Sequence, residues 1–179
     1  MNEELTIRPA DHGDLGPLLA LVQRAYRGDS ARAGWTHEAD LLDGQRTDAA
    51  ALRDILDDPQ QRLLLAEQAG SVIGCVQVTA KGAGTAYLGL LTVDPARQAG
   101  GLGKRLLDAA ERVAVEAFGA ERMEMTVIRQ RQELIAYYQR RGYALTGEQR
   151  PFPLDNPRFG LPKTRELAFV VLDKPLSRS

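Results

Sequence analysis

The stretch that most constrains the fold runs from Val93 to Leu107, where an apolar strand meets a glycine-bearing turn and the turn opens an amphipathic helix. The first N–H groups of a helix have no partner within the helix, and the helix dipole places partial positive charge there. The glycines Gly100, Gly101 and Gly103 would let the backbone approach a ligand closely. The junction is therefore predicted to bind the phosphate groups of a ligand.

Spacing separates the phosphate-binding loops that could use such a junction. A Walker A loop needs a glycine five positions before Gly103 and Ser or Thr two positions after it, whereas Gln98 and Arg105 stand there. A dinucleotide fingerprint beginning at Gly101 would need a small residue at Leu106, and it should open a βαβ unit near the start of its domain. The first loop is excluded and the second is disfavoured.

The segment Gln98-Ala99-Gly100-Gly101-Leu102-Gly103 matches the Q/R-x-x-G-x-G/A loop of the GCN5-related N-acetyltransferases, the GNAT superfamily, which this chain resembles. A strand ending Leu-Thr-Val-Asp-Pro precedes the loop, and the segment YQRRGY at 138–143 is similar to the family's Y-E-K-x-G-F. The resemblance implies that the loop holds the pyrophosphate of acetyl-CoA. The alternative is a strand-to-helix turn whose glycines serve only tight packing.

Hydrophobic periodicity predicts the other elements of the chain. The predicted helices are 15–26, 48–58, 101–118 and 131–141, and the predicted strands are 5–8, 62–67, 72–79, 87–93, 123–128, 143–148 and 167–172. The segment 28–47 is expected to be a loop with a short helix, and 150–163, which carries four prolines, is expected to lack regular structure. The order resembles the GNAT fold: α/β (α+β), with a mixed central sheet of six to seven strands, splayed in the middle and with helices on both faces.

Length and composition bound the class of protein. A chain of 179 residues with 44% hydrophobic and 26% charged residues is expected to form one globular domain over 1–179. Its motif core would be 85–145, and its acceptor-side elements 28–58 and 149–165. The 23 basic and 24 acidic residues leave a net charge of −1, which gives no reason to expect binding to nucleic acid or to a membrane. The expected partner is a small-molecule or peptide amine.

Cysteine and histidine usage argues against disulfides and metal sites. Cys75 is the only cysteine and lies in an apolar run, so a buried, inert thiol is expected. His12 and His37 stand alone, without the spacing of metal ligands. No apolar run approaches the roughly 20 residues that span a bilayer. We expect a cytoplasmic protein without a metal, either a monomer or a homodimer.

The resemblance also implies roles for residues of the motif core. The backbone N–H of Leu91 would polarise the thioester carbonyl, and Tyr138 would protonate the departing thiolate. An ordinary core aromatic is the alternative for Tyr138, because it lies at helical spacing with Leu134 and Ile135. The predicted acetyl-CoA-binding residues are Leu91, Thr92, Val93, Gln98, Ala99, Gly100, Gly101, Leu102, Gly103, Lys104, Arg129 and Tyr138.

The general base and the acceptor site are less defined. Histone-type members have a glutamate at the place that Tyr87 holds here, and a tyrosine is a poor base at neutral pH, although its hydroxyl can hold a water that relays the proton. Glu38, His37 and Glu148 are alternative bases, and for each a solvated surface role is the simpler interpretation. The family's asparagine is replaced by Arg129-Gln130-Arg131. Predicted acceptor-binding residues are Trp35, His37, Glu38, Arg150, Phe152 and Arg158.

Three functions are compatible with these residues. The first is an acetyl-CoA-dependent N-acetyltransferase that acts on a primary amine of a small molecule, amino acid or peptide by direct attack in a ternary complex. The second is a non-catalytic acyl-CoA-binding or sensing module, which the missing strand glutamate suggests. The third is a protein-interaction domain that has kept only the fold. The complete glycine loop favours the first.

Overall fold

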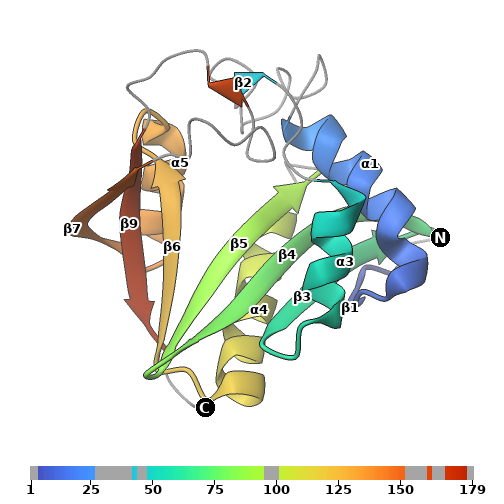
Figure 1. The fold of residues 1–179 in the computed structure, drawn as a ribbon, viewed down its shortest axis with the longest axis horizontal. Helices are drawn as coiled ribbons and strands as arrows, with labels where there is room; N and C mark the ends of the chain where they lie inside the picture. Colours follow the sequence, from blue (N-terminus) through green and yellow to red (C-terminus); the bar gives the residue numbers. More distant parts are fainter. Residues whose placement is uncertain are drawn as a thin grey trace.

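A seven-stranded mixed sheet runs through the molecule (Figure 1). A computed structural model describes residues 4–26, 42–43, 48–94, 101–151, 161–162 and 168–176. The strand order is β1-β3-β4-β5-β6-β9-β7. The strands are β1 (Thr6–Pro9), β3 (Gln61–Gln68), β4 (Ser71–Gly82), β5 (Thr85–Val93), β6 (Arg122–Ile128), β7 (Ala144–Pro151) and β9 (Ala168–Pro175).

Helices cover both faces of this sheet (Figure 1). On one face lie α1 (Leu15–Tyr26) and α3 (Ala49–Asp57), which pack with a buried cluster that includes Leu63 and Leu65 of β3. On the other face lie α4 (Leu102–Phe118) and α5 (Gln132–Arg140), which contribute to a second buried cluster that includes Leu64 and Ala66 of the same strand. Successive residues of a strand point to opposite faces, so a strand covered on both sides is a continuous apolar run. The predicted fold class and strand number are confirmed.

The helices begin and end where the sequence supplies the required groups. Asp48 caps α3 by accepting a hydrogen bond from the Ala51 N–H at 2.8 Å. Gly119 ends α4 in the left-handed conformation at φ +62°, a conformation that glycine adopts without steric cost. None of the helices in the described residues has the length and apolar character needed to cross a bilayer.

The last strand in the chain does not lie at the edge of the sheet, because β9 lies between β6 and β7 and leaves β7 at the edge. The expectation that 150–163 lacks regular structure is wrong at both ends of that segment. Pro151 still belongs to β7, where an edge strand tolerates proline, and Leu161–Pro162 forms the short strand β8. This strand pairs with β2 (Leu42–Asp43), so the two tracts predicted as irregular meet there.

Candidate active site

The strands β5 and β6 are parallel and pair only at their beginnings. Thr85 to Tyr87 of β5 are in register with Arg122 to Glu124 of β6. Beyond Tyr87 the ladder between the two described strands stops, although β5 continues to Val93 and β6 to Ile128. The two strands diverge there (Figure 1). The sheet is thus splayed in its middle, as the family resemblance implies, and the backbone edge of β5 after Tyr87 does not pair with β6 in the described residues.

A β-bulge lies in β5 on this diverging part. Cys75 of β4 pairs with Thr92, but Gln77 pairs with Gly89, so one residue of β4 opposes Leu90 and Leu91 of β5. Leu90 has φ +52°, a left-handed conformation that costs a non-glycine residue about 1–2 kcal/mol. Bulges and strained residues are concentrated beside active sites, where they redirect backbone groups. The bulge falls at the residue whose N–H is predicted to polarise a thioester.

The N-terminus of α4 fits the binding of a phosphate group. Gly101 is the N-cap residue with φ +74°, and no side chain caps the helix there. A Cβ added to Gly101 would have no atom within 4 Å, so the space beside this residue is open. Leu102 is 4% exposed and anchors the first turn in the core, whereas Lys104 is exposed. The N–H groups that no side chain caps and the helix dipole suit this end of the helix to bind an anion.

Gly103 is required for a different reason from that of Gly101. A Cβ built on Gly103 would lie only 2.7 Å from the hydroxyl oxygen of Tyr137 and 3.7 Å from its Cζ atom. The tyrosine ring is held in turn by Arg141, whose Cζ atom lies 3.8 Å from the ring centroid. Gly103 therefore lets the first turn of α4 pack against Tyr137 of α5.

This contact predicts a coupled pair of substitutions. Gly103→Ala should lower the free energy of unfolding by about 1–3 kcal/mol through overpacking, and Tyr137→Phe should relieve most of that loss because it removes the hydroxyl. Denaturant unfolding of both single variants and the double variant measures the coupling. Gly16→Ala is the matched control: Gly16 is also the second residue of its helix, but its Cβ would meet nothing within 4 Å. If Gly103→Ala lowers the free energy of unfolding equally in the wild type and in Tyr137→Phe, the contact between Gly103 and the Tyr137 hydroxyl does not limit packing.

Tyr138 lies on α5 in the same buried cluster as Leu91 and Val93, and 5% of it is exposed. Its ring makes edge contacts with Tyr137 at 5.4 Å and with Tyr143 at 6.0 Å between centroids. Tyr138 thus faces the core, as its helical spacing with Leu134 and Ile135 predicts. It is compatible with both interpretations of Tyr138, and the acid role stays a prediction.

Tyr143 is fixed by its own partners on two other elements. Its hydroxyl donates to the Glu111 carboxylate of α4 at 2.9 Å, and Lys174 of β9 donates to the same carboxylate at 2.9 Å. Burial is the main cause that raises the pKa of the Tyr143 hydroxyl, followed by the nearby Glu111 charge. Tyr143 is therefore neutral. Through the Glu111 carboxylate it is linked to α4 and to Lys174 of β9, and its ring contacts the ring of Tyr138.

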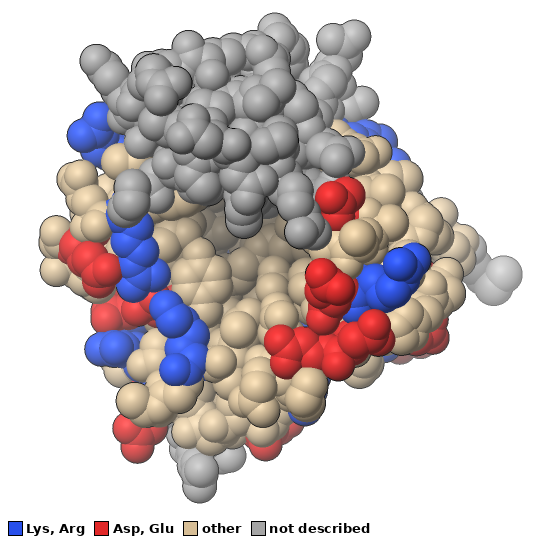
Figure 2. Space-filling view, viewed as in Figure 1, with Lys and Arg blue, Asp and Glu red and all other residues tan. Residues whose placement is uncertain are grey.

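A cluster of polar side chains lies on the opposite face of the sheet, the α1 and α3 face. Tyr87 points there because its neighbours Ala86 and Leu88 belong to the α4 cluster. Its hydroxyl is hydrogen-bonded to Thr126 Oγ1 of β6, where the two strands diverge. Figure 2 shows this face, hollowed in the middle, with basic and acidic side chains together on the flank of β6 and mostly acidic ones on the flank of α3.

Glu124 belongs to this polar cluster and was not predicted from the sequence. It is in register with Tyr87, is 9% exposed, and binds Lys81 Nζ at 3.2 Å and Arg150 Nη2 at 2.9 Å. Burial raises the pKa of the Glu124 carboxyl, but the hydrogen bonds from Lys81 and Arg150 outweigh burial and lower it below its ordinary value. The group is thus ionised at neutral pH. The sequence signal that could have identified Glu124 is its position between two methionines in an apolar strand.

The remaining predicted residues differ in burial. Thr92 and Val93 are buried at 0% and 1% exposure, and Arg129 is exposed at the end of β6, where its backbone N–H donates to the Ala168 carbonyl at 2.9 Å. Glu148 is exposed and pairs with Arg150 at 2.8 Å. Predicted residues that lie outside the described part of the chain are Trp35, His37, Glu38, Gln98, Ala99, Gly100, Phe152 and Arg158.

Cys75 is buried, as predicted. Burial raises the pKa of its thiol to about 12, with a smaller opposing effect from a hydrogen bond with Thr92. A thiol in this state is not a nucleophile at neutral pH. Within the described ranges no group of three or more His, Cys, Asp and Glu side chains has the arrangement of a metal site.

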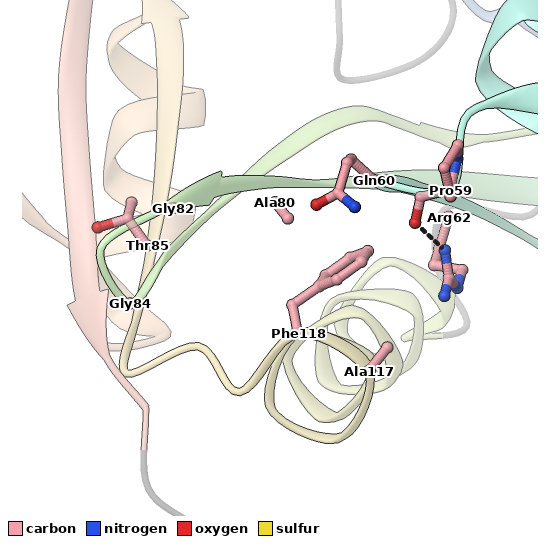
Figure 3. A pocket seen from close by; sticks show the side chains of 9 residues that line it. All are labelled: Pro59, Gln60, Arg62, Ala80, Gly82, Gly84, Thr85, Ala117 and Phe118. Carbon is pink, nitrogen blue, oxygen red and sulfur yellow. Dashed lines mark hydrogen bonds between the residues drawn. The ribbon is translucent and has the colours of Figure 1, made fainter.

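A cavity of about 350 Å³ lies away from the start of α4, between the hairpin at Gly82–Gly84 and the C-terminal end of α4 (Figure 3). Phe118 lies on one side of it, with the Arg62 guanidinium 5.0 Å from the ring centroid. The lining thus combines the Arg62 guanidinium with the C-terminal end of α4, which carries partial negative charge.

Comparison with known families resolves the class of protein. The model of the acetyltransferase (GNAT) family matches residues 22–143, which is more than half of the chain. The chain belongs to this family. The GNAT resemblance inferred from the glycine loop and the YQRRGY segment is thereby confirmed, and the class of enzyme is that of the acyltransferases. The matched range includes the bulge in β5, the start of α4 and Tyr138.

Solved structures share the fold at low sequence identity. An acetyltransferase of the GNAT family from Streptococcus pneumoniae is 22% identical, with a TM-score of 0.68, and the match covers 97% of this chain and 100% of that one. YncA from Salmonella typhimurium, solved with its cofactor acetyl-CoA, is 21% identical, with a TM-score of 0.70 and coverage of 98% and 96%.

The ribosomal-protein-S18-alanine N-acetyltransferase from Escherichia coli is 16% identical, with a TM-score of 0.71 and coverage of 98% and 96%. No curated protein sequence matches the chain. The comparisons thus give the family and the fold.

Proposed function

We propose that this GNAT enzyme transfers the acetyl group of acetyl-CoA to a primary amine of a small molecule, amino acid or peptide, by direct attack in a ternary complex. One juxtaposition carries the proposal. The bulge at Leu90 and Leu91 lies where β5 leaves β6, and β5 then runs to Val93, just before the segment that leads to the uncapped start of α4. One strand would thus supply the oxyanion donor and lead to the phosphate site.

Each part of this arrangement has a chemical task. The first N–H groups of α4 would bind the pyrophosphate, for which the open space beside Gly101 leaves room. The Leu91 N–H would stabilise the negative charge that develops on the thioester oxygen, a contact worth on the order of 100-fold in rate. Tyr138 would donate a proton to the leaving thiolate. The acceptor amine would approach from the face that carries Tyr87 and Thr126.

The polar cluster around Glu124 supports an acceptor that carries a carboxylate. Arg150 is anchored by Glu124 at 2.9 Å and by Glu148 at 2.8 Å, and 30% of its side chain is exposed. The β2–β8 pair supports an acceptor site made by the tracts 28–47 and 150–163, because it joins them. We propose that Tyr87, bonded to Thr126, relays the amine proton through water in place of the family's glutamate.

Thiol release from acetyl-CoA, measured over a panel of amines, amino acids, polyamines, aminoglycosides and peptides, tests the proposed activity. We expect amine-dependent release of CoA with at least one class of acceptor. Thermal stabilisation by CoA without turnover on any amine would favour a non-catalytic acyl-CoA-binding module, which the tyrosine at position 87 makes the second candidate. Neither stabilisation nor turnover would contradict both functions.

The role of Arg150 makes a specific prediction for the acceptor. Arg150→Gln should raise the KM of a carboxylate-bearing acceptor by about tenfold, the loss expected for one charge-assisted hydrogen bond, and should leave the KM of acetyl-CoA unchanged. Arg122→Gln is the matched control, because Arg122 is also a strand arginine with an acidic partner, Asp173 at 3.6 Å, but lies at the paired beginning of β6. An unchanged acceptor KM in Arg150→Gln would show that Arg150 does not bind the acceptor.

A further inference from the structure

The bulge in β5 is held by two buried side chains, Thr92 and Cys75. The Leu90 carbonyl accepts a hydrogen bond from Thr92 Oγ1 at 3.0 Å and a longer one from Cys75 Sγ at 3.6 Å. Thr92 and Cys75 are both 0% exposed, and they face each other across the ladder of β4 and β5. A left-handed leucine persists only where its surroundings hold it. These two donors supply that restraint from inside the protein.

The Leu90 carbonyl and the Leu91 N–H belong to the same peptide unit. A peptide bond is planar and trans, so its C=O and N–H groups point in opposite directions. A hydrogen bond that fixes the Leu90 carbonyl therefore also fixes the direction of the Leu91 N–H. Hydrogen bonding to the carbonyl also polarises the peptide unit, which makes its N–H a stronger donor.

The side chains on either side of the bulge show that the bulge reorients the peptide unit between Leu90 and Leu91. Ala86 and Leu88 pack in the α4 cluster, and regular alternation would place Leu90 there as well. Instead Leu91 and Val93 are in the α4 cluster, and Leu90 packs against the α1 and α3 cluster. The bulge shifts the alternation by one residue. The peptide unit between Leu90 and Leu91 is the point at which the shift occurs.

We propose that Thr92 is a positioning residue for acetyl transfer: its buried hydroxyl holds the Leu90 carbonyl and thereby aims and strengthens the Leu91 N–H that polarises the thioester. This inference rests on the proposed function. The Thr92 side chain is fully buried, so the effect of its hydroxyl would pass to the thioester through one peptide unit, whichever backbone atoms of Thr92 contact acetyl-CoA. A threonine that only fills the core would be replaceable by any side chain of its shape.

Two near-isosteric substitutions separate these roles. Thr92→Val keeps the shape and removes the donor, whereas Thr92→Ser keeps the donor and removes a methyl group. We expect Thr92→Val to lower kcat by about tenfold or more, with little change in the KM of acetyl-CoA, since loss of a direct oxyanion donor costs about 10²–10³-fold. Thr92→Ser should keep kcat near that of the wild type. Ile73→Val, a buried substitution on β4, controls for a general loss of stability.

A spectroscopic measurement reports the same effect without turnover. The ¹³C chemical shift of carbonyl-labelled acetyl-CoA, measured in the binary complex, should move on binding to the wild type and to Thr92→Ser, and should move less on binding to Thr92→Val. Thr92→Cys, which retains a weaker donor, should be intermediate in kcat and in the shift. If Thr92→Val is too unstable to assay, the comparison of Thr92→Cys with Thr92→Ser decides the question.

Equal kcat and equal carbonyl shifts in the serine, cysteine and valine variants would overturn the role of Thr92 and leave the proposed acetyltransferase function intact. Absence of acetyl-CoA binding and turnover in the wild type would overturn the proposed function, and the role of Thr92 with it.

Discussion

Tyr138→Phe is expected to lower kcat by about 100-fold while the affinity for CoA and the stability change little. General acid catalysis by a positioned side chain contributes about 10²–10⁴-fold, and the substitution removes only the hydroxyl. The ring keeps its edge contacts with Tyr137 and Tyr143. Single-turnover kinetics is the appropriate measurement, because slow product release would hide part of the effect in kcat.

Two further variants separate catalysis by Tyr138 from packing. Tyr138→Ala should lose about 3–5 kcal/mol of stability, because the ring is buried in the α4 cluster. Tyr143→Phe removes the neighbouring hydroxyl and its bond to Glu111, and it should leave kcat near that of the wild type. A single-turnover rate in Tyr138→Phe equal to that of the wild type would leave Tyr138 as a core aromatic.

Gly101→Val should weaken CoA binding by at least about 100-fold, equivalent to about 2.8 kcal/mol. The valine side chain would fill the open space beside Gly101, where the phosphates are proposed to lie. A β-branched residue also strains a backbone held at φ +74°. Isothermal titration calorimetry with CoA measures the loss.

Gly119→Val provides the matched control for that strain. Gly119 ends the same helix at φ +62°, so valine there is strained in a similar way, but it lies at the far end of α4 from the phosphate site. The control variant should lose stability and keep its affinity for CoA. Calorimetric affinity of Gly101→Val equal to that of Gly119→Val would contradict the assignment of this helix end.

Much of the fold could be predicted because its signals are local. The apolar runs of β3 and β4 and the helical spacing of α4 and α5 each lie within one short segment. The position of β9 between β6 and β7 could not be predicted from such signals. Its register with β6, from Arg122 with Pro175 to Ile128 with Phe169, joins residues about 40 to 50 positions apart in the chain. Nothing in either strand alone specifies that pairing.

The glycine motif located the candidate phosphate site at the start of α4, where the structure has Gly101 in the left-handed conformation. The bulge was not visible, because Leu90 and Leu91 are both apolar and either could have faced the α4 cluster. Glu124 was missed for a similar reason: its partners Lys81 and Arg150 come from distant strands and are found only in the folded chain.

The short ladder between β5 and β6 has a consequence for how the molecule resists unfolding. The sheet consists of two parts, β1-β3-β4-β5 and β6-β9-β7, and the described ladder joins them only from Thr85–Arg122 to Tyr87–Glu124. A ligand lying between the diverging ends would act as a non-covalent cross-link between the two parts. Substrate binding would then stabilise the contact between the two parts of the sheet. In the ligand-free enzyme, local unfolding would begin by separation of β5 from β6.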